Sequence, residues 1–169
     1  MKKPLKNIVL IGMPGSGKTT VGRILSSKLN KKFVDIDEYI EKQQGCSIPE
    51  IFKNGEEYFR SLELRAVEQI SIIEDVVIST GGGVIKYEKN MLNLKQKGII
   101  IFIDRPLNDI IQDLDTGGRP LLKNNIGEIK KIFKHRYSIY RYYCDFFVKN
   151  TGTLEKVLED IIKIYNSNI

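Results

Sequence analysis

Residues 12–19 read GMPGSGKT and match the pattern G-x-x-x-x-G-K-[ST] without gaps. The β-branched apolar run at residues 8–11 comes directly before them, and residues 19–29 carry apolar side chains at helical spacing. A strand, a glycine-rich turn and a helix in this order are typical of a phosphate-binding loop. Glycines let successive backbone N–H groups face an anion, and the following helix presents the positive end of its dipole. The motif predicts a nucleotide site, without separating a kinase from another NTPase.

Individual residues of this loop have distinct expected roles. Lys18 is expected to reach the β- and γ-phosphates, and the Thr19 hydroxyl is expected to ligate Mg²⁺. The alternative is a glycine-rich strand-to-helix turn that binds nothing. The residues predicted to bind the nucleotide here are Gly15, Ser16, Gly17, Lys18, Thr19 and Thr20.

Short apolar runs alternate with amphipathic segments along the rest of the chain. Further strands are predicted at residues 33–36, 76–79, 99–103 and 146–148. Helices are predicted at residues 39–44, 48–52, 55–73, 88–97, 128–143 and 154–165, and a polar loop at 115–127. This alternation predicts an α/β fold of three layers (α/β/α) around a five-stranded parallel sheet. Ligands of such sheets bind beyond the carboxyl ends of the strands.

Size and composition favour one domain, residues 1–169. The chain has 169 residues, of which 41% are hydrophobic, and this supports one core rather than two. Its net charge of +6 comes from scattered lysines, so we expect no nucleic-acid partner. Cys46 and Cys144 lack the spacing of a disulfide framework or a zinc site. No apolar run is long enough for a signal peptide or a membrane span, so we expect a cytoplasmic protein without a membrane partner.

Two carboxylates follow the second predicted strand. Asp35 and Asp37 are two residues apart, and alternation along a strand would place both on one face. Beside a phosphate site, one could hold Mg²⁺ through its water shell while the other accepts a hydroxyl proton. The alternative is that one of them only caps the next helix.

Other candidates come from glycine-rich segments and arginines. Three glycines at residues 81–83 follow the third predicted strand, and they indicate a close approach of a ligand to the backbone or, alternatively, a tight turn. Arg119 lies in the polar loop after two glycines, where it could close over the γ-phosphate or remain a solvated loop residue. Arg60 and Arg136 lie on predicted helices. The local pattern alone favours a surface position for Arg60 and does not distinguish Arg136. His135 is expected to be structural or at the surface.

Taken in order, these separated motifs resemble the shikimate kinase family, over about residues 8–148. The resemblance rests on the loop at 12–19, Asp35-x-Asp37, Phe59-Arg60-x-x-Glu63, Gly81-Gly82-Gly83, Arg119-Pro120-Leu121-Leu122 and Arg136-x-x-x-Tyr140. It implies a fold of the P-loop kinase type, with a substrate-binding segment at about residues 37–63 and a lid at about 112–123. It also implies transfer of the γ-phosphoryl group of Mg·ATP to the 3-hydroxyl of shikimate. The alternatives are a small P-loop kinase for gluconate or a nucleoside monophosphate, or a non-catalytic ATP-binding module.

The resemblance also implies roles for individual residues. Arg60 and Arg136 would clamp the shikimate carboxylate with their guanidinium groups. Asp35 would act on Mg²⁺ through water, and Arg119 would bind the phosphates. The substrate-binding residues would be Asp37, Arg60, Gly82, Gly83 and Arg136, and the catalytic residues Lys18, Asp37 and Arg119.

Two features depart from the family pattern. Residues 112–115 hold no arginine, although many members carry one shortly before the lid that packs on adenine. The lid is also short, since Arg119 directly follows two glycines.

We expect a monomer whose partner is a small-molecule substrate.

Overall fold

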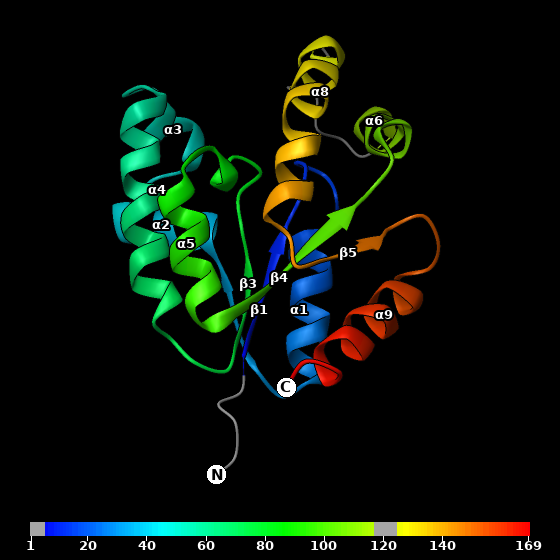
Figure 1. Ribbon diagram of the computed structural model, residues 1–169. Coiled ribbons are helices and arrows are strands. Elements are labelled where there is room, and N and C mark those ends of the chain that lie inside the picture. Colours follow the sequence, from blue (N-terminus) through cyan, green and yellow to red (C-terminus); the bar gives the residue numbers. More distant parts are fainter. Residues whose placement is uncertain (1–5, 117–124) are drawn as a thin grey trace.

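A computed structural model describes residues 6–116 and 125–169 of the chain (Figure 1). In this part of the chain the strands are β1 (Asn7–Ile11), β2 (Lys32–Asp35), β3 (Val76–Ser79), β4 (Gly98–Asp104) and β5 (Phe146–Lys149). They form a five-stranded sheet in the order β2-β3-β1-β4-β5, and all described pairs are parallel. The predicted five-stranded parallel sheet is therefore confirmed.

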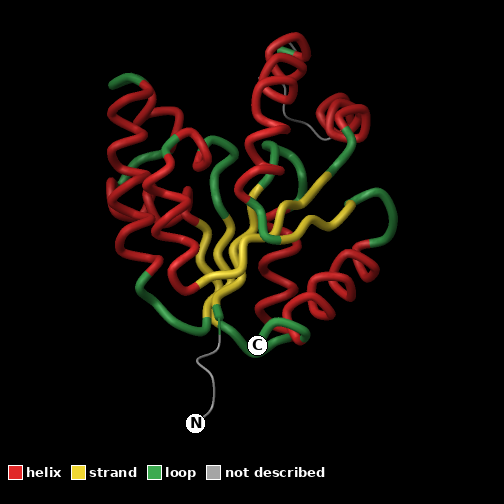
Figure 2. The backbone as a smooth tube through the Cα atoms, in the orientation of Figure 1, coloured by secondary structure: helices red, strands yellow, loops and turns green. Residues whose placement is uncertain are grey.

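Helices cover both faces of this sheet (Figure 2). One face packs against α1 (Lys18–Lys28) and α9 (Leu154–Asn166). The other packs against the helices α2 (Ile36–Gln44), α3 (Ile48–Phe52), α4 (Glu56–Ser71), α5 (Glu88–Lys97), α6 (Leu107–Thr116) and α8 (Ile126–Tyr143), with the short 3₁₀ helix η1 (Val84–Lys86). The predicted three-layer α/β/α architecture is thus confirmed. Within the described ranges we find no helix with the length and apolarity that crossing a bilayer requires.

The central strands are apolar because both of their faces are covered. In β1, Ile8 and Leu10 belong to the core on the α1 and α9 side, whereas Val9 and Ile11 belong to the opposite core. All four side chains are 0% exposed. This two-sided burial explains why the run reads as continuously hydrophobic rather than alternating.

The end of the second strand differs from the prediction. We expected a strand through Ile36 with both carboxylates on one face, but β2 ends at Asp35 and Ile36 already belongs to α2. The Asp35 carboxylate accepts hydrogen bonds from the backbone N–H groups of Asp37 and Glu38, so it is the N-cap of that helix. The strand-alternation argument for the two carboxylates is therefore wrong. Asp35 does cap α2, and its role toward Mg²⁺ stays a prediction.

The predicted loop at residues 115–127 is shorter at both ends. Residues 115 and 116 belong to α6, and residues 126 and 127 belong to α8. The predicted lid begins in the last turns of α6. The rest of it, Arg119 included, lies outside the described residues.

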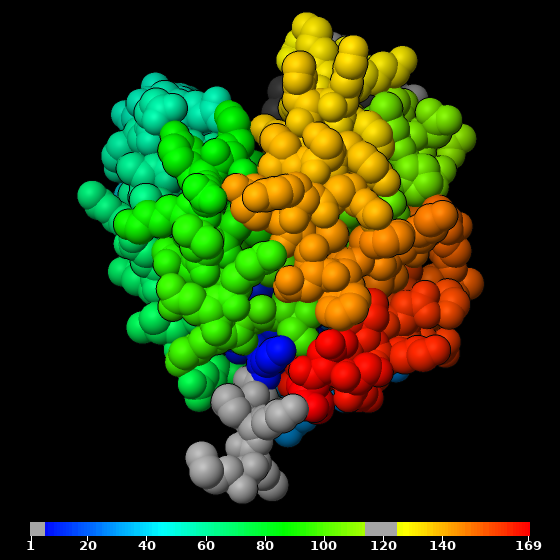
Figure 3. All heavy atoms as spheres, in the orientation of Figure 1, coloured from blue at the N-terminus to red at the C-terminus, as the bar shows by residue number. Residues whose placement is uncertain are grey.

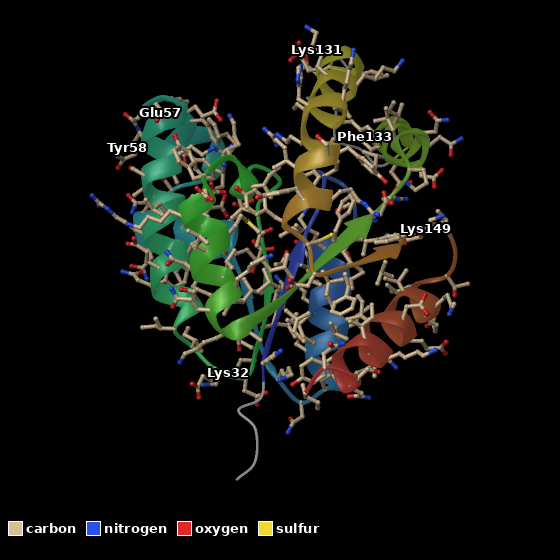
Figure 4. All side chains as sticks on the ribbon, in the orientation of Figure 1. Lys32, Glu57, Tyr58, Lys131, Phe133 and Lys149 are labelled. Atoms are coloured by element: carbon tan, nitrogen blue, oxygen red, sulfur yellow. The ribbon has the colours of Figure 1, made fainter. Side chains whose placement is uncertain are left out.

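The carboxyl ends of the strands lie together at one end of the molecule. Lys32, the first residue of β2, lies at the opposite end of the view from Glu57 on α4 and Lys131 on α8 (Figure 4). The surface is notched between α8 and the α3–α4 side of the molecule at that carboxyl end (Figure 3). Ligand sites of parallel α/β sheets lie at such an end.

Candidate active site

A cavity of about 700 Å³ opens beyond the carboxyl ends of β1, β2 and β3. Its wall combines the P-loop with the start of α2, the glycine segment after β3 and the start of α6. The lining residues are Pro14, Gly15, Gly17, Lys18, Thr19, Thr20, Asp35, Asp37, Glu38, Thr80, Gly81, Gly82, Arg105, Ile110 and Asp113. Residues far apart in the chain thus form one wall, because the parallel strands that precede them end side by side.

Lys18 is the first residue of α1 and is 7% exposed. Gly17 before it has a φ of 95°, a left-handed conformation that glycine adopts without a steric penalty. The Lys18 Nζ donates hydrogen bonds to the carbonyl oxygens of Gly12 at 2.9 Å and Met13 at 2.8 Å. Burial lowers the pKa of Lys18 to about 8, although the charges of Asp37 and Asp35 oppose this shift. The ammonium group is therefore mostly protonated at neutral pH.

Thr19 connects the P-loop with β2 and β3. Its hydroxyl donates to Asp35 Oδ2 at 2.8 Å and lies 3.3 Å from the Ser79 hydroxyl. This set contains only oxygen atoms, which suits Mg²⁺, an ion that usually keeps several waters and binds few protein ligands. In the described ranges there is no group of three or more His, Cys, Asp or Glu side chains that could hold a metal by itself. The donors present therefore fit an Mg²⁺ ion held largely by phosphates and water.

Asp37 is the second residue of α2 and lines the cavity. Its Oδ1 atom is buried and accepts no hydrogen bond from the described residues. Burial raises the pKa of Asp37 to about 6 and neighbouring Asp35 adds to the rise, whereas Lys18 and Arg60 oppose it. A buried acceptor without a partner can receive a donor from a ligand, and a pKa of about 6 leaves the carboxylate ionised at neutral pH.

Arg60 extends from α4 and is 7% exposed. Its Nη1 donates to Glu63 Oε2 at 2.8 Å, and its Nε and Nη2 each lie 3.3 Å from Glu56 Oε1. The surface position favoured by the local helix pattern is therefore wrong. The long-range reason is Gly83, where an added Cβ would lie 2.6 Å from the Arg60 Cζ. The helix pattern of α4 contains no information about this contact with a distant loop.

The glycine segment after β3 also packs against the other half of the site. A Cβ added at Gly82 would lie 2.6 Å from the Pro14 Cδ, and one at Gly81 would lie 3.0 Å from the Asp37 Oδ1. Side chains of the protein thus explain why residues 81–83 are glycines. The contact with a ligand that the sequence suggested stays a prediction.

Arg136 lies on α8 and is half-buried. Burial raises the pKa of Glu63, while the charges of Arg60 and Arg136 oppose the rise. The charge of Arg136 likewise acts on Lys18, since it contributes to the lowered pKa after the main effect of burial. Arg136 is therefore electrostatically coupled to both halves of the site. His135 is exposed on the same helix, in agreement with its predicted surface position.

Sequence reasoning missed Arg105 as a site residue. It follows β4 and lines the cavity, where its Nη1 donates to the Gly15 carbonyl at 3.0 Å and pairs with Asp113 Oδ2 at 2.7 Å. A signal was present in the sequence. Residues 106–118 contain Asp109, Asp113 and Asp115 but no lysine or arginine, so Arg105 is the cation that precedes an acidic segment beside the nucleotide loop.

The sheet order, the P-loop and the charged cavity next to it define a P-loop nucleotide-binding protein. A sequence model of the family "Shikimate kinase" matches residues 14–166. The shikimate kinase of Clostridium botulinum (strain Alaska E43 / Type E3) is 47% identical over 165 residues, which are 97% of this chain and 100% of the relative. The chain belongs to the shikimate kinase family.

Solved structures agree with this assignment. A shikimate kinase from Acinetobacter baumannii, in complex with shikimate, superimposes with a TM-score of 0.88 at 34% identity, covering 97% of this chain and 94% of the other. The shikimate kinase from Aquifex aeolicus gives a TM-score of 0.84 at 42% identity, covering 96% and 97%. The predicted family, fold class and ATP-dependent kinase activity are confirmed.

Proposed function

We propose that this chain transfers the γ-phosphoryl group of Mg·ATP to the 3-hydroxyl of shikimate, and that Asp37 accepts the hydroxyl proton. The observation that supports this role is the buried Oδ1 of Asp37, which has no partner in the described residues. A raised pKa of about 6 makes this carboxylate a better proton acceptor than an exposed aspartate, while it remains ionised at neutral pH. The positive charges of Lys18 and Arg60 stabilise the ionised form.

On the nucleotide side, the backbone N–H groups of residues 15–20 and the start of α1 hold the phosphates. Lys18 exchanges its contacts with the Gly12 and Met13 carbonyls for phosphate oxygens, which as anions are stronger acceptors. Arg119 is assigned to the same phosphates from the lid. It lies outside the described residues, so this role rests on the sequence motif alone.

Thr19 and Asp35 would hold Mg²⁺, Thr19 directly and Asp35 through a water molecule. The ion, when bound, offsets the negative charge of the phosphates around the group being transferred. The hydrogen bond of 2.8 Å between the Thr19 hydroxyl and Asp35 supports this pair as ligands, because it keeps the two oxygen groups next to each other. Asp35 also accepts two backbone hydrogen bonds from α2, which keep its carboxylate in place.

On the acceptor side, Arg60 and Arg136 hold the shikimate carboxylate, and the backbone of Gly82 and Gly83 contacts the ring substituents. The burial of Arg60 and its pairing with Glu63 support this role, because a fixed guanidinium loses little entropy when it binds a carboxylate. The distance between this clamp and Asp37 would then decide which hydroxyl faces the phosphoryl group.

ADP release with Mg·ATP tests this function when shikimate, gluconate, AMP, CMP and no acceptor are compared. Release only with shikimate supports the proposal, and release with another acceptor contradicts it. Release with none, from folded ATP-binding protein, would indicate a binding module. Arg60→Ala should raise the KM for shikimate far more than the KM for ATP, and equal losses would contradict the clamp.

The remaining assignments are proposals of the same kind. We propose a single-domain monomer, residues 1–169, that acts in the cytoplasm without nucleic-acid or membrane partners. The scattered lysines support the absence of nucleic-acid and membrane partners, because they form no long basic block. Light scattering after size exclusion checks the monomer, since a dimer would double the mass of 19.4 kDa.

A further inference from the structure

Tyr140 is a buried residue of α8 to which the proposed reaction assigns no role. It is 0% exposed, and its ring stacks on Phe102 of β4 with centroids 5.2 Å apart and an interplanar angle of 18°. The hydroxyl donates a hydrogen bond to the carbonyl oxygen of Gly82 at 2.6 Å. The packed ring leaves the hydroxyl little freedom to move, so the position of the Gly82 carbonyl is tied to α8.

The same hydroxyl also interacts with Arg136. Burial raises the pKa of Tyr140 to about 12, while the positive charge of Arg136 opposes that rise. The two residues are four positions apart on α8 and so lie on one face of the helix. A tyrosine hydroxyl has one donor hydrogen and two acceptor lone pairs, so it can serve Gly82 and Arg136 at once.

Gly82 and Arg136 come from separate elements, and both are assigned above to the acceptor. The hydroxyl of Tyr140 therefore links α8, which carries Arg136 one turn earlier on the same face, to the glycine segment. We propose that Tyr140 is a positioning residue that gives the acceptor pocket its selectivity for a carboxylate by holding Arg136 in register with Gly82. This inference rests on the proposed role of Arg136 as one arm of the carboxylate clamp.

The variant Tyr140→Phe tests the inference, because it keeps the ring on Phe102 and removes only the hydroxyl. We would measure kcat and KM for ATP, for shikimate and for shikimate methyl ester, which has the same ring and hydroxyls but no anionic carboxylate. The KM for shikimate should rise about tenfold, because Arg136 is then misplaced relative to Gly82. The KM for the ester and the KM for ATP should change less than about twofold.

The decisive quantity is the ratio of kcat/KM for the acid to kcat/KM for the ester. Both values come from one preparation, so a loss of folded protein cancels from the ratio. Wild type should favour the acid strongly, and Tyr140→Phe should reduce that preference about tenfold. The same substitution in an Arg136→Ala background should have almost no further effect on the ratio, because the residue through which Tyr140 acts is then absent.

Tyr137→Phe is the matched control. Tyr137 lies one turn earlier on α8, packs edge-on against the same Phe102 and donates its hydroxyl to Asp104 Oδ2 at 3.0 Å rather than to the acceptor pocket. It should leave the acid-to-ester ratio as in wild type. An equal drop in both variants would show a general effect of α8 packing and overturn the inference.

Failure of the inference and failure of the proposed function give different results. If wild type itself does not distinguish the acid from the ester, the carboxylate clamp is wrong. If wild type distinguishes them and Tyr140→Phe retains the full ratio, the clamp stands and the role of Tyr140 is wrong. If Tyr140→Phe lowers the ratio equally with Arg136 present or absent, Tyr140 does not act through Arg136.

Discussion

The two halves of the proposed site are built in opposite ways. The nucleotide half comes mainly from one continuous stretch, residues 12–19, and relies on backbone groups and the start of α1. The acceptor half gathers side chains from α2, α4, the glycine segment and α8, and several of them are buried charges. A local sequence pattern can encode the first half, whereas only the folded sheet brings the second together.

The difference also has an energetic side. Glu63 is 0% exposed, and burial raises its pKa while Arg60 opposes that rise. Burying charges costs free energy that their pairing only partly offsets. The acceptor half therefore loses folding stability to several buried charges, whereas the nucleotide half buries mainly Lys18 within backbone that glycine allows. Substitutions in the two halves should accordingly differ in their effects on activity and stability.

The largest effect is expected for Lys18→Met in the nucleotide half. The substitution removes the cation that we assign to the β- and γ-phosphates, and kcat should fall about 10³-fold or more. The free energy of unfolding should not fall strongly, because the loss of hydrogen bonds to two loop carbonyls is offset by removal of a buried charge whose pKa burial lowers. Steady-state kinetics and thermal melting check this. Lys28→Met, an exposed lysine at the end of the same helix, should retain wild-type kcat.

Asp37→Asn should produce the next largest effect and should sharpen the contrast between the halves. The amide cannot accept the proton, so kcat should fall about 10²- to 10⁴-fold. In wild type, kcat/KM for shikimate should decline as the pH falls below about 6, where Asp37 becomes protonated. The residual activity of Asp37→Asn should lack this acidic decline. If the variant still shows the decline, the titrating group is not Asp37.

The same substitution should stabilise the free protein at pH 8. The folded-state pKa of Asp37, about 6, lies above its ordinary value of 3.8, so its contribution to stability is present below about pH 4 and is lost as the pH rises through 6. At pH 8 wild type therefore carries a buried charge that asparagine lacks. The free energy of unfolding should rise by up to about 3 kcal/mol at pH 8 and change much less at pH 4. Denaturant titrations at both pH values check the sign.

Gly83→Ala should affect the acceptor half alone. The new Cβ would lie 2.6 Å from the Arg60 Cζ, and the guanidinium would have to move. Gly83 has a φ of −98°, which alanine accepts, so the effect should be local rather than a backbone distortion. The KM for shikimate should rise about tenfold and the KM for ATP should stay nearly constant. Gly152→Ala is a suitable control, because an added Cβ there has no neighbour within 4 Å.

The same contrast explains what the sequence could predict. The P-loop, the order of strands and helices and the parallel sheet follow from local patterns and composition. The capping role of Asp35 was harder to predict, since Asp-x-Asp fits both a strand end and a helix start. The burial of Arg60 was not predictable from α4, because it depends on Gly83, a residue that becomes its neighbour only in the folded protein. The role of Arg60 in the site was predicted from the resemblance to a family, because the helix pattern contained no information about it.

The smallest effect is expected for Arg105→Ala, which tests whether a side chain other than Lys18 contributes to the nucleotide half. It is the one side-chain cation of the cavity wall, apart from Lys18, in the described part of the chain. Its guanidinium is held by the Gly15 carbonyl and Asp113, so it is already fixed at the wall before a nucleotide binds. Arg105→Ala leaves Asp113 without this partner at the wall beside a polyanionic ligand.

The KM for ATP should therefore rise about three- to tenfold in Arg105→Ala, and the KM for shikimate should stay within about twofold. Raising the ionic strength should reduce the difference from wild type, because salt screens charges that are partly exposed. Arg141→Ala is the matched control, since Arg141 stacks over Phe147 at 3.8 Å and does not line the cavity. An unchanged KM for ATP in Arg105→Ala would mean that the P-loop backbone and Lys18 suffice to bind the nucleotide. The nucleotide half would then rely on side chains even less than the presence of Arg105 in the cavity wall indicates.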